Sequence, residues 1–369
     1  MPAGHDLVCP FCLNRLSSLQ LVRACSVNPE HRKDTKGFRA KLNLFGDRCG
    51  ASGCPGRYTR ILCPRCEEEL PGNITQYDGY TRLAITAPSG GGKTVLITTM
   101  LHELFSHSSQ LGLNIGAMDR KTSAYYRARF TELYDKLTAP FGTVKGVCVP
   151  MQYYVQNTRK GTATRTPTYS LTIFDGAGED QENPSDTETR YIAEAKMLIL
   201  LIDPLKLYGL RREMTDDEIA KGGGDADRDV VDERYTQDFI DQLVSYIRIA
   251  TKLTVHQKLK IPVAVVMCKM DLLRRFFPED AVTFNPPDMT FGTFDEMDSQ
   301  QVHTEIDALI SEYCPSLNVG LNAVFQKWRY FGVSSYGVQP LGPKQLAEDP
   351  KPLRVMDPLM WNMSVSGIL

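Results

Sequence analysis

The sequence Ala87-Pro-Ser-Gly-Gly-Gly-Lys-Thr94 directly follows a stretch, Tyr80 to Thr86, that is typical of a β-strand. Three glycines let the backbone curl so that successive N–H groups point at one anion, and Lys93 adds a positive charge for the β- and γ-phosphates of a nucleotide. The Thr94 hydroxyl is placed to hold Mg²⁺. The apolar segment Val95 to Leu104 predicts a helix whose positive end strengthens this field. These features predict a phosphate-binding loop between a strand and a helix.

The loop departs at one place from the usual G-x-x-x-x-G-K-[ST] pattern, because Ala87 stands at the first position. An ordinary Gly-rich turn that happens to contain Gly-Lys-Thr is the alternative, and the flanking strand and helix argue against it. We expect nucleotide contacts from Ser89, Gly90, Gly91, Gly92, Lys93, Thr94 and Val95.

Length and composition limit the class of protein. A chain of 369 residues has room for two domains, and an apolar fraction of 42% is enough for a core. The net charge of −2 excludes a chain that is polybasic or strongly acidic as a whole. The sequence has no run of about 18 apolar residues and no secretion signal at its N-terminus, so we expect a cytoplasmic protein without a membrane span.

Cysteine is concentrated near the N-terminus, where residues 1–66 hold seven of the ten cysteines. In a chain without a secretion signal, such clustering indicates metal ligation and not disulfides. Cys9-Pro-Phe-Cys12 and Cys63-Pro-Arg-Cys66 are C-x-x-C turns, each of which aims two thiolates at one point. Together they predict a tetrahedral, structural Zn²⁺ site. Reduced cysteine without a metal is the alternative.

Residues that lie between the two C-x-x-C turns in the sequence could form a second metal site. Cys25, His31, Cys49 and Cys54 supply three thiolates and one imidazole, although His31 lies in a polar run and could simply be solvated. The same residues 1–66 carry eleven Lys and Arg against four Asp and Glu. This excess permits binding of nucleic acid or an acidic partner, and a solvated basic face is the alternative.

A second phosphate-reading motif follows a pair of predicted strands at 147–157 and 168–174. The second strand ends in Asp175-Gly-Ala-Gly178. Asp175 can hold the hydration shell of Mg²⁺, and the Gly178 N–H can sense the γ-phosphate. The conformational freedom of Gly178 would let the next segment reorder when that phosphate leaves.

A base-reading motif follows the apolar strand predicted at 261–267. The strand ends in Cys268-Lys-Met-Asp271. Guanine presents two donors, N1–H and N2–H₂, on one edge, and the Asp271 carboxylate can accept both, whereas adenine presents no such pair. The stem of Lys269 would cover one face of the base. A surface turn is the alternative.

A last motif follows the strand predicted at 327–333. Ser334 and Ser335 could present backbone N–H groups to the guanine carbonyl oxygen, and a loop of small residues is the alternative. The apolar run from Met197 to Asp203 indicates one more buried parallel strand. Because every motif follows a strand, we expect all of them at one edge of a parallel sheet.

The remaining segments are less informative. The helical stripe of Tyr125, Arg129, Leu133 and Leu137 indicates packing. Residues 211–234, with many acids and three consecutive glycines, are expected to be a mobile insertion. We expect domains at 1–70 and 80–345, a C-terminal extension at 346–369, and insertions at about 110–142, 211–234 and 275–300.

The phosphate loop, Asp175-x-x-Gly178, Lys269-x-Asp271 and Ser334-Ser335 occur in an order that resembles the Ras-like superfamily of P-loop GTPases. The resemblance covers about residues 80 to 340. It implies an α/β three-layer sandwich with a mostly parallel six-stranded sheet, binding GTP or GDP with Mg²⁺. With its zinc-ribbon-like N-terminal segment, the chain is similar to the prokaryotic double-GTPase group. That similarity implies a protein partner, such as a second GTPase-like protein.

Some positions depart from the superfamily pattern. Cys268 stands where Asn or Thr usually ties the base-reading loop to the phosphate loop, which should reduce guanine affinity. Glu179 stands in place of a water-orienting Gln, so slow hydrolysis is expected. Thr143 is our choice for the Mg²⁺-sensing Thr of the first switch. The resemblance gives Lys93, Gly178 and Glu179 catalytic roles.

These features favour a GTP-binding, slowly hydrolysing molecular switch that acts through a partner protein. One alternative is a nucleotide-binding scaffold with poor hydrolysis, which the residues Cys268 and Glu179 would explain. Another is a GTPase that associates with nucleic acid through residues 1–66.

Overall fold

The computed structural model describes residues 7–17, 20–33, 47–87, 91–140, 149–175, 186–224, 231–287, 294–338, 340–342 and 345–369. The chain divides into two compact units. The N-terminal unit is Met1–Tyr80 with Pro167–Ser170, and the larger unit is Thr81–Thr166 with Leu171–Leu369. Of the predicted site residues, Ser89, Gly90, Thr143, Gly178 and Glu179 lie outside the described residues.

The N-terminal unit is built on a small antiparallel sheet. Its strands, in the order β1-β2-β3, are β1 (Val22–Ala24), β2 (Arg60–Leu62) and β3 (Glu69–Leu70). A small apolar cluster that includes Leu7, Leu16 and Ile61 surrounds the buried Cys9 and Cys63. So small a core gives little stabilisation by itself, which favours a metal as a further staple.

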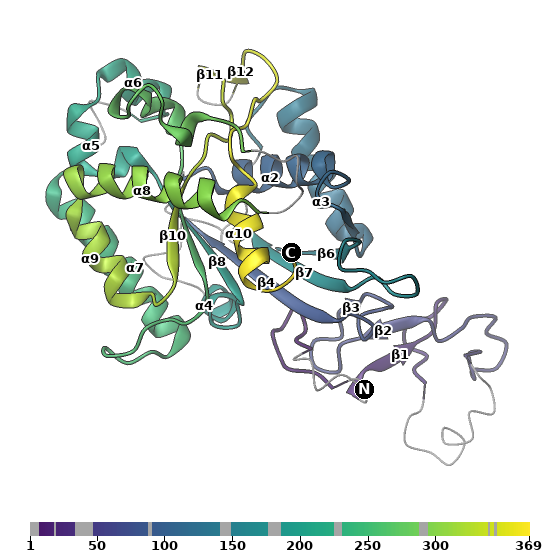
Figure 1. The fold of residues 1–369 in the computed structure, drawn as a ribbon. Coiled ribbons are helices and arrows are strands. Elements are labelled where there is room, and N and C mark those ends of the chain that lie inside the picture. Colours follow the sequence, from purple (N-terminus) through teal and green to yellow (C-terminus); the bar gives the residue numbers. More distant parts are fainter. Residues whose placement is uncertain are drawn as a thin grey trace. The chain divides into compact units, whose positions relative to one another are not determined.

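The larger unit alternates strands and helices (Figure 1). Its first half comprises β4 (Gly79–Thr86), α2 (Lys93–His107), β5 (Leu113–Ala117), α3 (Arg120–Phe130), the π-helix η2 (Thr131–Asp135), β6 (Val149–Asn157), β7 (Thr168–Asp175), α4 (Asp186–Ala193) and β8 (Met197–Ile202). Its second half comprises η4 (Pro204–Lys206), α5 (Tyr208–Glu213), α6 (Asp216–Lys221), α7 (Glu233–Thr251), β9 (Val263–Met267), η5 (Met270–Leu272), η6 (Arg274–Phe276), η7 (Val282–Phe284), α8 (Glu296–Tyr313), α9 (Pro315–Val324), β10 (Trp328–Gly332), β11 (Pro340–Gly342), β12 (Gln345–Leu346) and α10 (Asp357–Val365).

The main sheet has seven strands in the order β10-β9-β8-β4-β7-β6-β5. β10, β9, β8 and β4 pair in parallel, whereas β5 pairs antiparallel with β6. The sequence predicted six strands, and the additional one is β5. Only one of its five residues, Leu113, is buried, so it lacks the apolar pattern that marks a strand.

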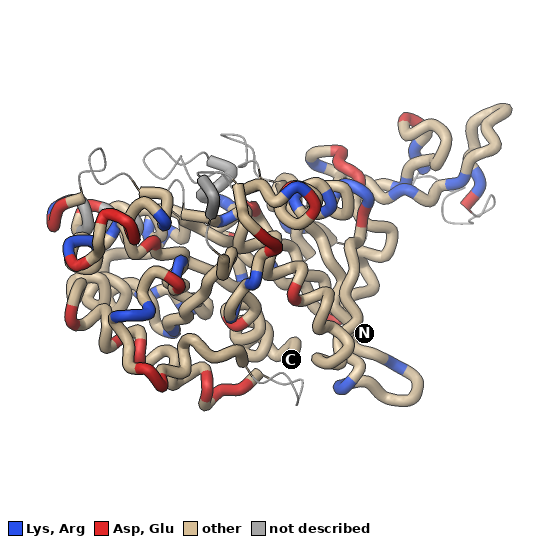
Figure 2. Tube along the Cα trace, turned by 90° about the horizontal axis from the view of Figure 1, so that it is seen from above, with Lys and Arg blue, Asp and Glu red and all other residues tan. Residues whose placement is uncertain are grey.

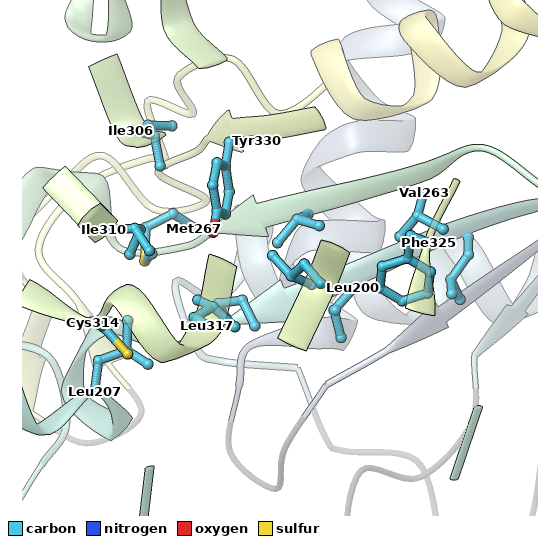
Figure 3. Packing of buried hydrophobic residues seen from close by; sticks show 14 of the residues in the cluster. Leu200, Leu207, Val263, Met267, Ile306, Ile310, Cys314, Leu317, Phe325 and Tyr330 are labelled. Atoms are coloured by element: carbon cyan, nitrogen blue, oxygen red, sulfur yellow. The ribbon is translucent and has the colours of Figure 1, made fainter. Parts of the chain in front are cut away.

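Both faces of the sheet are covered. Strand β8 is buried at every position, as expected for a strand packed on two sides. Figure 3 shows one face, where the packed residues include Leu200, Val263 and Met267 from strands and Ile306, Ile310 and Leu317 from α8 and α9. On β10, the Phe331 ring lies 5.6 Å from that of Trp361 in α10, which also packs on β8 and β9. The predicted α/β layering is therefore confirmed, and residues 346–369 contribute to the core.

The part of the 211–234 segment that the structure describes includes the end of α5 and all of α6, so it contains helices that the sequence did not predict, while its mobility stays a prediction. Thr215 and Glu218 form a capping box at the start of α6. Arg275 makes an ion pair with Glu218, with 3.0 Å between Nε and Oε1. One of the acidic residues that suggested mobility, Glu218, therefore belongs to the capping box and also pairs with Arg275. Among the residues described, no helix combines the length and apolarity needed to cross a bilayer.

A buried arginine joins the C-terminal segment to the start of α8. Arg354 Nη1 contacts Asp298 and Asp357 at 2.7 Å each, and its Nη2 donates to Asp298 at 2.8 Å. The Arg354 side chain has no exposed surface. Burial raises the pKa of Asp357 to about 6, against the opposing effect of Arg354. The two ions are tolerated inside the protein because they are paired.

Replacing Arg354 with Met should lower the free energy of unfolding by about 3–5 kcal/mol, because the Asp357 carboxylate would be left buried without its cation. The Asp357 pKa would rise further above its unfolded value. A carboxyl group whose pKa is raised by folding contributes stability below its unfolded pKa, and this stability is lost as the pH rises through the folded pKa. The decrease in unfolding free energy caused by the substitution should therefore be larger near about pH 8 than near about pH 5. Urea denaturation at both pH values measures this effect.

Lys351→Met is the matched control, because Lys351 is 64% exposed in its ion pair with Glu348. Exposed pairs contribute about 1 kcal/mol or less. Equal losses for the two variants would contradict the assigned role of Arg354.

Candidate functional site

The loops that carry the predicted motifs meet at one edge of the main sheet. In the parallel register, Thr86 is opposite Leu200, while Met267 is opposite both Ile202 and Gly332. The carboxyl ends of β4, β8, β9 and β10 therefore lie side by side. Ligands of open α/β sheets bind at this edge.

The described part of the predicted phosphate loop includes one residue with a left-handed backbone. Gly92 has φ 74° and ψ 18°, in the left-handed region that favours glycine, and α2 begins at the next residue. Gly91 and Lys93 are buried, whereas Thr94 and Val95 are partly exposed. The start of α2 therefore offers backbone N–H groups and a lysine at the loop end of β4.

Asp175 ends β7 and is fully buried. Strand β7 starts beside β4, since the Asp78 N–H donates to the Thr168 carbonyl at 2.7 Å, so the neighbouring strands run the same way. Asp175 therefore lies at the same edge as the phosphate loop. A buried carboxylate and the Thr94 hydroxyl are oxygen ligands of the kind that Mg²⁺ prefers, so these residues fit the cation.

Tyr125 was not foreseen as a site residue. Its hydroxyl donates to Asp175 Oδ2 at 2.8 Å, and the Arg129 guanidinium lies 3.6 Å from the centre of its ring. Both residues belong to the stripe that the sequence interpretation assigned to packing. Helical spacing predicted that they share a face, but nothing in the sequence indicated that this face reaches Asp175.

The base-reading loop and the Ser334 loop are joined. The Asp271 N–H donates to Ser334 Oγ at 2.9 Å, and the Met270 N–H donates to the Val333 carbonyl at 3.2 Å. Asp271 itself is exposed, while Ser334 is buried and Ser335 partly exposed. The carboxylate predicted to read guanine is therefore held at its backbone and open at its side chain.

Lys269 has a partner that the sequence interpretation missed. Its Nζ contacts Asp203 Oδ2 at 2.7 Å and donates to the Gly222 carbonyl at 2.8 Å. Asp203 directly follows β8. In the sequence it stood out only as the last residue of the apolar run, which gave no indication of an ion pair. These contacts fix the stem of Lys269 and tie the segment after α6 to the base-reading loop.

Cys268 is a buried, neutral thiol. Burial raises its pKa, and its Sγ donates to the Ile202 carbonyl at 3.3 Å. In the part of the chain that the structure describes, this contact ties the base-reading loop to the end of β8 and not to the phosphate loop. Its consequence for guanine affinity stays a prediction.

The four cysteines of the two C-x-x-C turns converge in the N-terminal unit. The Sγ atoms of Cys9 and Cys66 lie 3.7 Å apart, as do those of Cys12 and Cys63. All four lie within 4.8 Å of one another. A tetrahedral zinc with Zn–S bonds of about 2.3 Å has thiolates about 3.8 Å apart, so the geometry fits Zn²⁺. All four corners would be filled by protein, as in structural sites.

The second predicted ligand set also converges. Cys25 and Cys54 Sγ are 3.6 Å apart, and Cys49 Sγ lies 3.5 Å from His31 Nδ1. Standard Zn–S and Zn–N bonds predict a sulfur-to-nitrogen distance of about 3.6 Å. The four ligand atoms lie within 4.8 Å of one another, so this set too could hold zinc.

The basic excess of residues 1–66 is partly neutralised. Ion pairs join Arg23 and Lys33 to Asp47, and Arg32 to Glu67. Figure 2 shows charges of both signs along the described chain. These pairs reduce the positive charge that could face a nucleic acid.

Comparisons with known proteins give distant likenesses. No protein-family model matches the sequence. The chain is 22% identical over 343 residues to the putative ESX-1 scaffolding and assembly protein SaeC of Mycolicibacterium smegmatis, covering 84% of this chain and 80% of that protein.

Two similar solved structures are of the S. cerevisiae Ski7 GTPase-like domain. The GTP complex has a TM-score of 0.32 and 13% identity, covering 71% of this chain and 44% of that one. The complex with GDP and inorganic phosphate has a TM-score of 0.36 and 13% identity, covering 80% and 51%. The chain spans about half the length of these structures. Likenesses as weak as these do not assign a function to this chain.

Proposed function

We propose that the protein is a Mg²⁺-dependent GTP-binding switch that hydrolyses GTP slowly and acts through a partner protein. The observation that carries the proposal is the exposed Asp271 carboxylate, held through its backbone by Ser334 at the sheet edge where α2 begins with Lys93. A base acceptor and a phosphate cradle at one sheet edge suit a guanine nucleotide.

In this proposal each of the site residues has a separate role. Lys93 and the first N–H groups of α2 bind the phosphate oxygens, where negative charge is stabilised as the γ-phosphate leaves. Thr94 and Asp175 would hold Mg²⁺, which when bound neutralises charge on the β- and γ-phosphates. Glu179 accepts a hydrogen bond from the attacking water but, unlike an amide, donates none, so hydrolysis is slow without a partner.

The proposed output is a rearrangement of the segment after Asp175 when the γ-phosphate leaves, allowed by Gly178. The partner would be a protein that distinguishes the two states, such as a second GTPase-like protein. Both zinc sites would be structural.

Phosphate release from GTP and from ATP tests the proposal. Wild type should release phosphate from GTP in preference to ATP, and Lys93→Ala should reduce the rate about 10²- to 10³-fold, because a charge that stabilises the transition state is lost. Lys260→Ala is the matched control, since Lys260 is exposed and precedes β9, at the opposite edge of the sheet. Equal, background-level release from both nucleotides would defeat the hydrolytic switch. Calorimetry showing tight GTP binding without turnover would then favour the scaffold.

A further inference from the structure

The structure connects a tyrosine of α3 to the acid that would hold the cation. The Tyr125 hydroxyl donates to Asp175 Oδ2 at 2.8 Å, from a residue 50 positions earlier in the chain. Asp175 has no exposed surface, so the orientation of its carboxylate depends on the groups that it contacts. A hydroxyl that donates to a carboxylate makes a charge-assisted hydrogen bond, which is stronger than a neutral one.

The start of α3 is fixed to the sheet. Asp119 caps the helix by accepting from the Thr122 N–H at 2.7 Å and from Gln152 Nε2 at 3.2 Å. In return, the Gln152 N–H donates to Thr122 Oγ1 at 3.0 Å. Thr122 and Gln152 are buried. Tyr125 lies one turn further along the same face, so these contacts on β6 set the position of its ring.

Two further contacts hold this helix. Arg129, one turn beyond Tyr125, stacks over the tyrosine ring at 3.6 Å, which fixes the plane of the ring. The Tyr126 ring lies 5.2 Å from that of Phe105 in α2. Helix α3 therefore contacts both the helix that starts at Lys93 and the carboxylate at the end of β7.

We propose that Tyr125 is a positioning residue for the divalent cation of the nucleotide site, an inference that rests on the proposed function. Its hydroxyl donates to one oxygen of the Asp175 carboxylate and so fixes the plane of the carboxylate. The remaining lone pairs are then oriented towards the hydration shell of the cation. Groups that orient metal ligands in this way change metal affinity by about 10- to 100-fold.

The test is the Mg²⁺ dependence of GDP release, followed with a fluorescent GDP analogue on the full chain. Tyr125→Phe keeps the ring under Arg129 and removes only the hydroxyl. It should raise the Mg²⁺ concentration for half-maximal retention of the nucleotide by about 10-fold or more. The GDP affinity in EDTA and the melting temperature should stay unchanged, which a general disturbance of the fold would not allow.

Two further variants serve as the negative and the positive control. Tyr126→Phe removes a neighbouring hydroxyl of the same helix and should behave as wild type. Asp175→Asn should lower the Mg²⁺ affinity more than Tyr125→Phe does. An unchanged Mg²⁺ requirement in Tyr125→Phe, with Asp175→Asn impaired, would overturn the role of Tyr125 alone. If wild type retains no guanine nucleotide at any Mg²⁺ concentration, the proposed function itself fails, and this inference with it.

Discussion

Removing zinc should unfold the N-terminal unit while the larger unit stays folded. The apolar cluster around Cys9 and Cys63 is small, and the two ligand sets join segments that are far apart in sequence. Structural zinc contributes about 10–16 kcal/mol of binding free energy that the apo fold would lack. Treatment with a chelator should therefore make residues 7–66 sensitive to protease, while fragments of the larger unit persist. Metal analysis of the purified protein should find two zinc ions per chain.

Cys63→Ser tests the same claim one ligand at a time. It should remove one zinc and expose the N-terminal unit to protease. The control is Cys314→Ser, because Cys314 is also buried but belongs to the larger unit and to neither ligand set. This variant should keep its zinc. If the chelator leaves residues 7–66 as resistant as before, the zinc sites do not hold the unit together.

Asp271→Asn should weaken GDP binding about 100-fold, because a hydrogen bond to a charged group contributes up to about 3 kcal/mol. The carboxylate can accept from both guanine donors, whereas an amide presents one acceptor and one donor. That donor would face the N2–H₂ group of guanine. Xanthine carries a carbonyl oxygen there, so the variant should prefer xanthosine diphosphate to GDP. Competition against a fluorescent GDP analogue measures both affinities.

The substitution changes only an exposed side chain and keeps the hydrogen bond from the Asp271 backbone N–H to Ser334 Oγ. The melting temperature should therefore not change. Asp280→Asn is the control, because Asp280 is exposed and follows in the same segment. An Asp271→Asn variant that binds GDP as tightly as wild type would mean that this acid does not contact the base.

The features that the sequence predicted well are local. The C-x-x-C turns carry their geometry in their spacing, and the apolar runs before Asp203 and Cys268 identified buried strands by composition. The strand and helix that flank the motif Ala87–Thr94 were also predicted, and the structure adds that Gly92 has a left-handed backbone just before α2.

The features that it missed depend on contacts between distant segments. The Tyr125–Asp175 and Lys269–Asp203 pairs join residues 50 and 66 positions apart. A single sequence shows each residue but not the pair. Strand β5 was missed because antiparallel pairing at the edge of a sheet does not require an apolar strand. Helix α6 was missed because its acids are also typical of a solvated segment, although Glu218 belongs to its capping box.

The identity of the bound base is tested most directly by titrating the wild-type protein, in Mg²⁺, with GDP and with ADP in a calorimeter. GDP should bind at least about 100-fold more tightly, because adenine cannot supply the two donors that Asp271 would accept and leaves the acid without partners. Equal affinities, or tighter binding of ADP, would contradict it.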